Sequence, residues 1–342
     1  MAPEYIPVPN VELSSGGKIP LVGLGLVADP PTRECDESTW QSKPGQVTQA
    51  VKTALEAGYR HIDGAFVYRN EKEVGAGIRA SGVPREEIFV TSKLWCTKHR
   101  DVGAALNESL ELLGLEYLDL YLIHWPVPLN PRGNDPMFPK NVDGSRDLDK
   151  DWSIARTWEQ MEQVQEKGLT KAIGISNFSE AFIDDLLKTA KIPPAANQAS
   201  PSLPIAAGAQ TLTVNCPQIE LHPYLPQHEL VEYLRSKNIV AQAYSPLGST
   251  DSPLLDDDDI KKIADKHGVP VGTILISWSG ALFFPRFSSP PSWTGSDSFV
   301  RPVASPLQIE TVERRVVVLP KSVTEHRIVD NLKLVKLDRD DM

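Results

Sequence analysis

The chain has 342 residues, of which 41% are hydrophobic and 23% charged, so it is long enough to bury a sizeable core. Its 45 Asp and Glu against 35 Lys and Arg give a formal net charge of -10. An acidic chain without basic runs is a poor candidate for binding nucleic acid or an anionic membrane surface.

Other global features also limit the class of protein. The three cysteines are too few for a disulfide framework, which fits a reducing compartment. The first ten residues lack the basic and apolar regions of a signal peptide. No run of about 18 apolar residues is long enough to span a membrane. We therefore expect a cytoplasmic protein without a membrane partner.

Short apolar runs of strand length recur along the chain, and most of them end in a polar residue. Several, such as 118–124, are apolar at consecutive positions, which is typical of strands buried on both faces. The predicted strands are 19–25, 59–63, 88–93, 118–124, 171–177, 195–198, 239–245 and 316–321.

Segments with helical periodicity lie between these strands. Several end at a glycine, the residue that most readily adopts the left-handed conformation after a helix. The predicted helices are 46–57, 71–80, 102–113, 154–167, 180–189, 227–236 and 257–266. This alternation predicts a parallel α/β fold, either a (β/α)8 barrel or an open doubly wound sheet.

Two glycine-rich segments bear on that choice, because 23–28 (GLGLVA) and 75–80 (GAGIRA) both fit a dinucleotide-binding pattern. Two prolines follow the first segment closely and prevent a phosphate-binding helix there, and the second lies inside a helical segment. We interpret both as glycines needed for packing. Residues 11–19 (VELSSGGKI) predict a hairpin that closes the bottom of a barrel.

In a (β/α)8 barrel, functional side chains gather at the carboxyl ends of the strands. The residues at these ends are Asp63, Lys93, His124, Asn177, Gln198, Tyr244 and Lys321, and Tyr68 lies five residues after the first of them. A Lys93–Asp63 ion pair beside Tyr68 would stabilise the phenolate and lower the pKa of the tyrosine. Such a tyrosine can protonate a developing alkoxide, with a second hydrogen bond from His124, in the reduction of a carbonyl.

Seven long motifs in order resemble the aldo-keto reductase family from about residue 11 to residue 342. They are GYRHIDGAFVYRNEKEVG, IFVTSKLW, LGLEYLDLYLIHWP, KAIGISNFS, QIELHPYLPQ, AYSPLGS and VVVLPKSVTEHRIVDN. The resemblance implies a single-domain (β/α)8 TIM barrel that transfers a hydride from NADPH to an aldehyde or ketone without a metal. It implies Tyr68 as proton donor, Lys93 and Asp63 as the pair that lowers its pKa, and His124 as the residue that orients the substrate carbonyl.

The resemblance also assigns residues to NADPH. Ser176 and Asn177, with either Gln198 or Gln218, match the positions that hold the nicotinamide carboxamide, and Tyr244 matches the aromatic residue that stacks on its ring. The other cofactor positions are Ser245, Leu247, Ser249, Lys321, Ser322, Val323, Arg327 and Asn331. Two cations beside one 2′-phosphate favour NADPH over NADH. The alternative for Arg327 is a surface ion pair with Asp330, three residues further along a helix.

The substrate pocket is implied in the same way. Trp40, Trp95 and Trp125, together with His124, match positions that line it. The long loop after the fourth strand, 127–151, looks like that of fungal relatives acting on glyceraldehyde, glycerol and related sugar aldehydes. We therefore expect a small hydroxylated aldehyde as substrate and a monomeric enzyme.

Three segments depart from the family pattern, namely 26–38, 199–218 and 280–311. Without them the sequence rejoins as GLG-TWQSKPGQV, AANQ-IELHPY and SWS-VERRVVVLPKSV. Because they are irregular, we interpret them as translated introns or gene-model errors, with genuine surface loops as the alternative. The family's C-terminal tail over the substrate pocket is also missing after KLDRDDM. Two other outcomes therefore stay open: a folded barrel without useful turnover, and a defective product that folds poorly.

Overall fold

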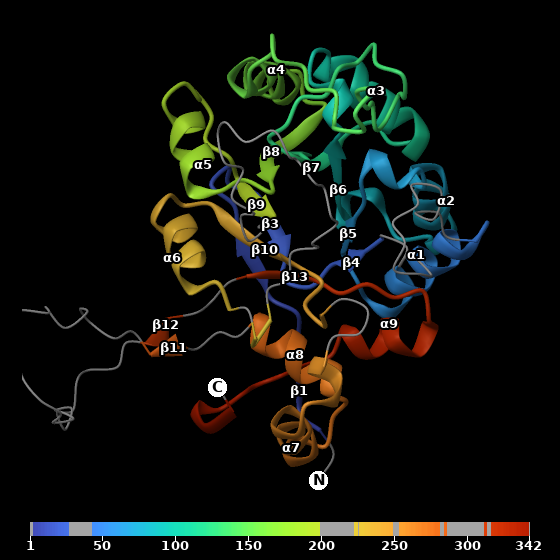
Figure 1. Cartoon of the computed structure of the whole chain (residues 1–342). Coiled ribbons are helices and arrows are strands. Elements are labelled where there is room, and N and C mark those ends of the chain that lie inside the picture. The colour runs from blue at the N-terminus through green and yellow to red at the C-terminus, as the bar shows by residue number, and fades with distance from the viewer. Residues whose placement is uncertain are drawn as a thin grey trace, which may run out of the picture.

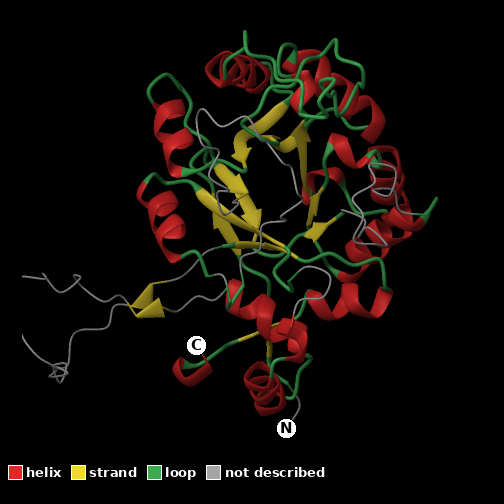
Figure 2. Ribbon diagram, viewed as in Figure 1, coloured by secondary structure: helices red, strands yellow, loops and turns green. Residues whose placement is uncertain are grey.

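The computed structural model describes residues 3–26, 43–198, 222–224, 226–248, 253–280, 284–285, 311–312 and 316–341. Eight strands within these ranges form one sheet, in which every neighbouring pair is parallel. In sheet order they are β13 (Val317–Leu319), β10 (Val240–Tyr244), β9 (Ala196–Gln198), β8 (Thr170–Ser176), β7 (Leu118–Ile123), β6 (Phe89–Leu94), β5 (His61–Asp63) and β4 (Leu24–Gly25). Figure 2 shows them inside a ring of helices.

The two edge strands of this sheet meet and close it into a barrel. Parallel bridges join Val22 to Val318 and Gly25 to Lys321, and the Gly23 amide donates to the Val318 carbonyl at 2.9 Å. Gly23 has to be a glycine, because a Cβ there would lie 2.5 Å from Nδ1 of His61. The predicted (β/α)8 barrel is confirmed, and the open doubly wound sheet is not what forms.

Helices follow the strands and surround the barrel (Figure 1). They are α1 (Gln46–Ala57), α2 (Glu71–Ser81), α3 (Val102–Leu113), α4 (Ile154–Glu166), α5 (Glu180–Leu187), α6 (His228–Ser236), α7 (Asp258–His267), α8 (Val271–Ser279) and α9 (Glu325–Asn331). Asp101 and Asp257 cap α3 and α7 by accepting hydrogen bonds from first-turn N–H groups. Gly58 and Gly114 end α1 and α3 in the left-handed conformation. The predicted helix bounds are confirmed to within two residues.

The main core lies between the barrel wall and the helices. Every residue of β6 and β7 is buried, as is typical of strands covered on both faces. Trp158 of α4 and Tyr121 of β7 are among the largest side chains buried there. This closely packed wall fixes the positions of the strand ends, where the functional side chains lie.

The N-terminal hairpin consists of β2 (Asn10–Glu12) and β3 (Lys18–Pro20), which pair antiparallel. The predicted strand 19–25 is therefore two strands, because its first residues belong to this hairpin. Another ladder joins β1 (Tyr5–Ile6) to β14 (Leu334–Val335), so both ends of the described chain are held together.

Two of the three irregular segments lie almost wholly outside the described residues. The described ends of the third, β11 (Phe284–Pro285) and β12 (Thr311–Val312), pair antiparallel, and Figure 1 shows this pair away from the barrel. Within the described ranges, no helix is both long and apolar enough to cross a membrane.

Candidate active site

The predicted residues at the strand ends come together at one end of the barrel. Asp63, Ser176, Gln198 and Tyr244 are the last residues of their strands, and Lys93 is the last but one of β6. His124 follows β7 directly, and Asn177 follows β8. Because all eight strands are parallel, these side chains share the carboxyl-terminal rim of the barrel.

Asp63 and Lys93 form an ion pair inside the barrel. The Lys93 Nζ lies 2.7 Å from Oδ1 of Asp63 and 2.7 Å from the carbonyl oxygen of Gly64. The lysine side chain is 0% exposed, and the aspartate side chain is 2% exposed. Burial lowers the pKa of Lys93, and the charge of Asp63 opposes this shift. The pair therefore keeps a cation in a place where a lone lysine would lose its proton.

Tyr68 ends a short 3-10 helix, Phe66–Tyr68, that follows β5. Its ring centroid lies 5.5 Å from the Lys93 Nζ. Burial, and then the negative charge of Asp63, raise the pKa of Tyr68 well above its ordinary value. The expected lowering of this pKa is not what the structure gives, because loss of hydration disfavours the phenolate and Asp63 repels it, and together they outweigh the attraction of the Lys93 cation. Tyr68 is therefore a neutral phenol that holds its proton at physiological pH.

His124 lies beside Tyr68, with their ring centroids 5.8 Å apart and their planes nearly perpendicular. Burial, and then the positive charge of Lys93, lower the pKa of His124 well below its ordinary value. The imidazole is consequently neutral, and its Nδ1 has no hydrogen-bond partner among the described residues. A neutral histidine in this position can donate a hydrogen bond without adding a charge.

Ser176 and Asn177 lie next to this group and are held in place by hydrogen bonds. The Asn177 Nδ2 donates to the His124 carbonyl oxygen at 2.7 Å and to the Ser176 Oγ at 3.0 Å. Asn177 has a φ of 65°, the left-handed conformation that asparagine tolerates better than most residues. The bend turns the chain at the end of β8 and keeps both polar side chains at the rim.

The predicted cofactor residues around β10 and β13 occupy one region of the rim. The Lys321 Nζ contacts the Tyr244 hydroxyl and lies 3.6 Å from the centroid of its ring. Ser245 is buried, Leu247 and Ser322 are half-buried, and Val323 is exposed.

Arg327 and Asn331 lie on the next element, α9. Arg327 is exposed, whereas Asn331 is buried against α8. Asp330 takes Lys333 as its ion-pair partner at 2.7 Å, so the surface pair with Arg327 that the sequence left open is not what forms.

Aromatic side chains and a long loop cover Tyr68 and His124. Trp95 packs edge-on against His124, with ring centroids 5.3 Å apart, and against Phe138 at 5.2 Å. The Trp95 Nε1 donates to the Met137 carbonyl oxygen at 2.7 Å, which ties it to the loop after β7. Trp125 packs against the same cluster. Phe138 and Met137 were not predicted, because no periodicity marks a loop residue as part of a site.

Three predicted site residues lie outside the described part of the chain: Trp40, Gln218 and Ser249. Gln198, the described candidate for the amide position, donates from Nε2 to Oδ2 of Asp63 at 3.0 Å. Within the described ranges, no group of three or more His, Cys, Asp or Glu side chains is arranged to hold a metal ion.

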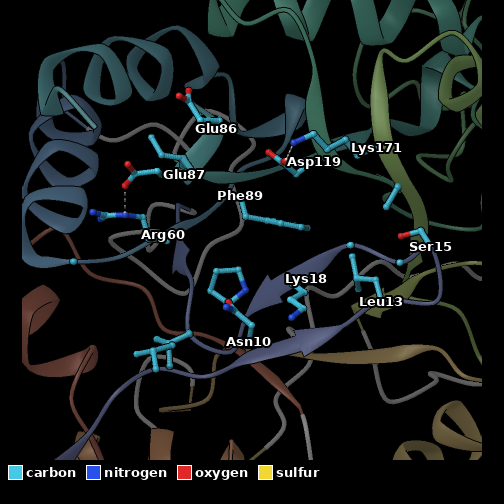
Figure 3. A pocket seen from close by; sticks show the side chains of 18 of the residues that line it. Asn10, Leu13, Ser15, Lys18, Arg60, Glu86, Glu87, Phe89, Asp119 and Lys171 are labelled. Atoms are coloured by element: carbon cyan, nitrogen blue, oxygen red, sulfur yellow. Dashed lines mark hydrogen bonds and ion pairs between the residues drawn. The ribbon is translucent and has the colours of Figure 1, made fainter. Parts of the chain in front are cut away.

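A cavity of about 670 Å³ lies at the opposite end of the barrel, between the β2–β3 hairpin and the first residues of the strands (Figure 3). Its wall includes Arg60, Glu87 and Phe89, with Asp119 and Lys171 close by. Arg60 lies 3.5 Å from Glu87, and Lys171 lies 2.9 Å from Asp119, so these charges largely satisfy one another. This cavity is separate from the group at the carboxyl ends of the strands.

Comparisons with known proteins agree with this geometry. The sequence profile of the Aldo/keto reductase family matches residues 32–342. Glycerol 2-dehydrogenase (NADP(+)) of Saccharomyces cerevisiae is 42% identical over 338 residues, which cover 97% of this chain and 88% of that protein. D-galacturonate reductase of Hypocrea jecorina is 41% identical over 336 residues, with the same coverage of 97% and 88%.

A solved structure, the aldose reductase from Schistosoma japonicum, superposes with a TM-score of 0.74 at 33% sequence identity. The match covers 97% of this chain and 89% of that structure. The profile, the relatives and the barrel lead to the same conclusion: this chain belongs to the aldo/keto reductase family.

Proposed function

We propose that the chain reduces aldehydes and ketones to alcohols with NADPH, and that Tyr68 supplies the proton. The observation that carries this proposal is the buried group of Asp63, Lys93, Tyr68 and His124 at the carboxyl rim. Family membership and the names of the relatives, which include an NADP(+)-dependent glycerol dehydrogenase and a galacturonate reductase, support the reaction and the cofactor.

The residues at the rim fit a nicotinamide cofactor. Tyr244 offers an aromatic face for a flat ring, and Lys321 and Arg327 offer two cations for a phosphate group. The amide hydrogens of Gln198 point to Asp63 and Gln242, which leaves its Oε1 as the atom available to a ligand amide. We therefore assign the carboxamide position to Ser176, Asn177 and Gln198.

The mechanism assigns one task to each residue of the group. NADPH, when bound, supplies the hydride. Tyr68 keeps its proton at the phenol oxygen, because burial and Asp63 raise its pKa, and gives it to the carbonyl oxygen as that oxygen becomes an alkoxide. An alkoxide is a stronger base than a phenolate, so the transfer is favourable despite the raised pKa.

Lys93 and His124 support this transfer. The Lys93 ammonium, 5.5 Å from the Tyr68 ring, stabilises the phenolate that remains after the proton has left. The neutral His124 donates a hydrogen bond to the same carbonyl oxygen and so fixes its position. Trp95, Phe138 and the loop that holds them exclude water from the reaction.

The substrates that we propose are small hydroxy-aldehydes such as glyceraldehyde. The support is the aromatic wall around Trp95, together with the two fungal relatives whose names give glycerol and galacturonate as their substrates. We further propose that the chain works as a cytoplasmic monomer, which size-exclusion chromatography of the purified protein would test.

Consumption of NADPH with glyceraldehyde, compared between the wild type and Tyr68→Phe, tests the proposed function. We expect kcat to fall by about 100-fold or more, because a general acid contributes roughly that factor. Binding of NADPH should change little. Tyr121→Phe is the matched control, because that buried hydroxyl has no hydrogen-bond partner among the described residues. Equal rates for wild type and Tyr68→Phe would overturn the assignment of Tyr68.

A further inference from the structure

The carboxylate of Asp63 is held from two sides of the barrel. Lys93 on the neighbouring strand β6 takes Oδ1 at 2.7 Å, and Gln198 on β9 takes Oδ2 at 3.0 Å. The order of the sheet places β5 and β9 apart, with β6, β7 and β8 between them. The hydrogen bond from Gln198 therefore crosses the barrel interior, and rotation of the carboxylate would break both contacts.

The hydrogen-bonding capacity of these groups fixes the orientation of Gln198. An ionised Asp63 only accepts hydrogen bonds, so Gln198 has to present its NH2 group to it. The Nε2 of Gln198 also lies 3.4 Å from Oε1 of Gln242. Gln242 is the direct neighbour of Gln198 in the register of β9 and β10. The second amide hydrogen of Gln198 thus has its acceptor on the next strand.

Gln242 accepts the hydrogen bond from Gln198 but leaves its own amide nitrogen without a partner in the described part of the chain. Its side chain is 0% exposed, and its Nε2 has no hydrogen-bond partner among the described residues. A buried N–H group without an acceptor destabilises the fold, and an apolar side chain of similar size would avoid this loss. The benefit of a glutamine at this position is the oxygen that it offers to Gln198.

We propose that Gln242 is a positioning residue for catalysis, which acts through Gln198 on the Asp63–Lys93 pair. The inference rests on the proposed function, because the pair matters to turnover through Tyr68. With Gln242 in place, the Gln198 amide cannot turn, the Asp63 carboxylate keeps its plane, and the Lys93 ammonium stays beside the Tyr68 ring. Without Gln242, the Asp63–Lys93 pair is free to shift away from Tyr68. This shift slows the transfer of the proton from Tyr68 more than it weakens the binding of NADPH or substrate.

The first test is a double-mutant cycle of Gln242→Met and Gln198→Met, with kcat and KM measured for an aldehyde at saturating NADPH. We expect Gln242→Met to lower kcat about tenfold with KM and the Kd of NADPH within about twofold of wild type. The double variant should be no slower than Gln198→Met alone, because the second change acts only through the first. If Gln242→Met lowered kcat only by disturbing the fold, its loss of kcat would instead add to the loss caused by Gln198→Met.

Two variants serve as controls in the cycle. Gln242→Glu keeps an acceptor oxygen for Gln198 and should recover part of the kcat that Gln242→Met loses. Gln160→Met removes a half-buried glutamine of α4 that bonds the backbone around Arg100 and Val102 and contacts no residue of the proposed relay, so it should leave kcat unchanged. A kcat of Gln242→Met within twofold of wild type, or additive losses in the double variant, would overturn the proposal.

Crystal structures of the wild type and Gln242→Met decide the same question without any activity. We expect the distance from Gln198 Nε2 to Asp63 Oδ2 to exceed about 3.5 Å in the variant, the limit of a hydrogen bond. An unchanged contact in the variant would overturn the positioning role. A wild-type protein that oxidises no NADPH would end the proposed function instead, and the crystal structures would still decide the role of Gln242.

Discussion

At the scale of single residues, Asp63 is not the only buried carboxylate of the barrel that the structure describes. Glu71 at the start of α2 is also buried and is 2% exposed. The Ser92 Oγ donates to Oε1 of Glu71 at 2.6 Å. Burial raises the pKa of Glu71 to about 6, although the bond from Ser92 works against this shift.

The raised pKa of Glu71 makes stability depend on pH. The folded protein binds this proton more tightly than the unfolded chain, so stability falls as pH rises from the ordinary value of 4.5 through about 6. The full effect is about 2 kcal/mol, of which about 1 kcal/mol falls between pH 5 and pH 7.5.

Glu71→Gln should remove this dependence. We expect the free energy of unfolding of the variant, relative to wild type, to rise by about 1 kcal/mol between pH 5 and pH 7.5 in urea titrations. The exposed Glu111→Gln on α3 is the control for loss of a carboxylate charge. A difference between Glu71→Gln and wild type that is constant with pH would contradict the prediction.

At the scale of elements, the third irregular segment joins two strands that are already paired. Pro285 is the register partner of Thr311, and Phe284 is that of Val312. Gly280, the first residue of this segment, caps the end of α8, and Leu26, the first residue of segment 26–38, is buried in the main core. Apart from these two boundary residues, we propose that 26–38, 199–218 and 280–311 lie outside the barrel core, whether they are translated introns or surface loops.

Replacement of residues 286–310 by Asn-Gly tests this proposal for the third segment. A two-residue turn of this type closes antiparallel strands in register, and the shorter loop lowers the entropy cost of closure. We expect the Tm to stay equal or rise, with unchanged NADPH consumption. A fall in Tm of more than about 5 °C, which is roughly 3–4 kcal/mol for a chain of this size, would show that the segment stabilises the fold. Sequencing of the mature transcript decides separately whether the three segments are encoded in it.

At the scale of the whole molecule, the barrel and its cofactor are linked thermodynamically. A ligand that binds only the folded state raises the free energy of unfolding by about 2.7 kcal/mol at 100 times its Kd. We expect NADPH to stabilise the chain by this amount in denaturant titrations and NADH to stabilise it less at the same concentration. A chain that binds NADPH without turnover would still be stabilised, whereas a chain that folds poorly would not.

Arg327→Leu sharpens this prediction. The variant should lose most of the difference between NADPH and NADH, because the 2′-phosphate loses one of its two cations. Lys333→Met, which removes a cation that lies just after α9 and pairs with Asp330, is the matched control. Equal stabilisation of the wild type by NADPH and NADH would contradict the assignment of Arg327 and Lys321 to the phosphate.

The sequence by itself determined the alternation of strands and helices and the residues at the strand ends. Strands such as β7 are recognisable because they are buried on both faces and therefore mostly apolar. Helix ends such as Gly58 and Gly114 are recognisable because few other residues adopt the left-handed conformation easily. The motifs around Asp63, Tyr68, Lys93 and His124 then pointed to the family and to its chemistry.

Only the tertiary structure decided how these residues interact. The pKa of Tyr68 is raised and not lowered, because burial depends on every element packed around the ring and outweighs the nearby cation. α8 shows little amphipathic pattern, since it is buried from Thr273 to Ser279. The bond from Gln198 to Asp63 joins residues 135 positions apart, and closure of the barrel is what brings them together. The position of Gln242 beside Gln198 likewise depends on the register of β9 and β10, which no local sequence pattern encodes.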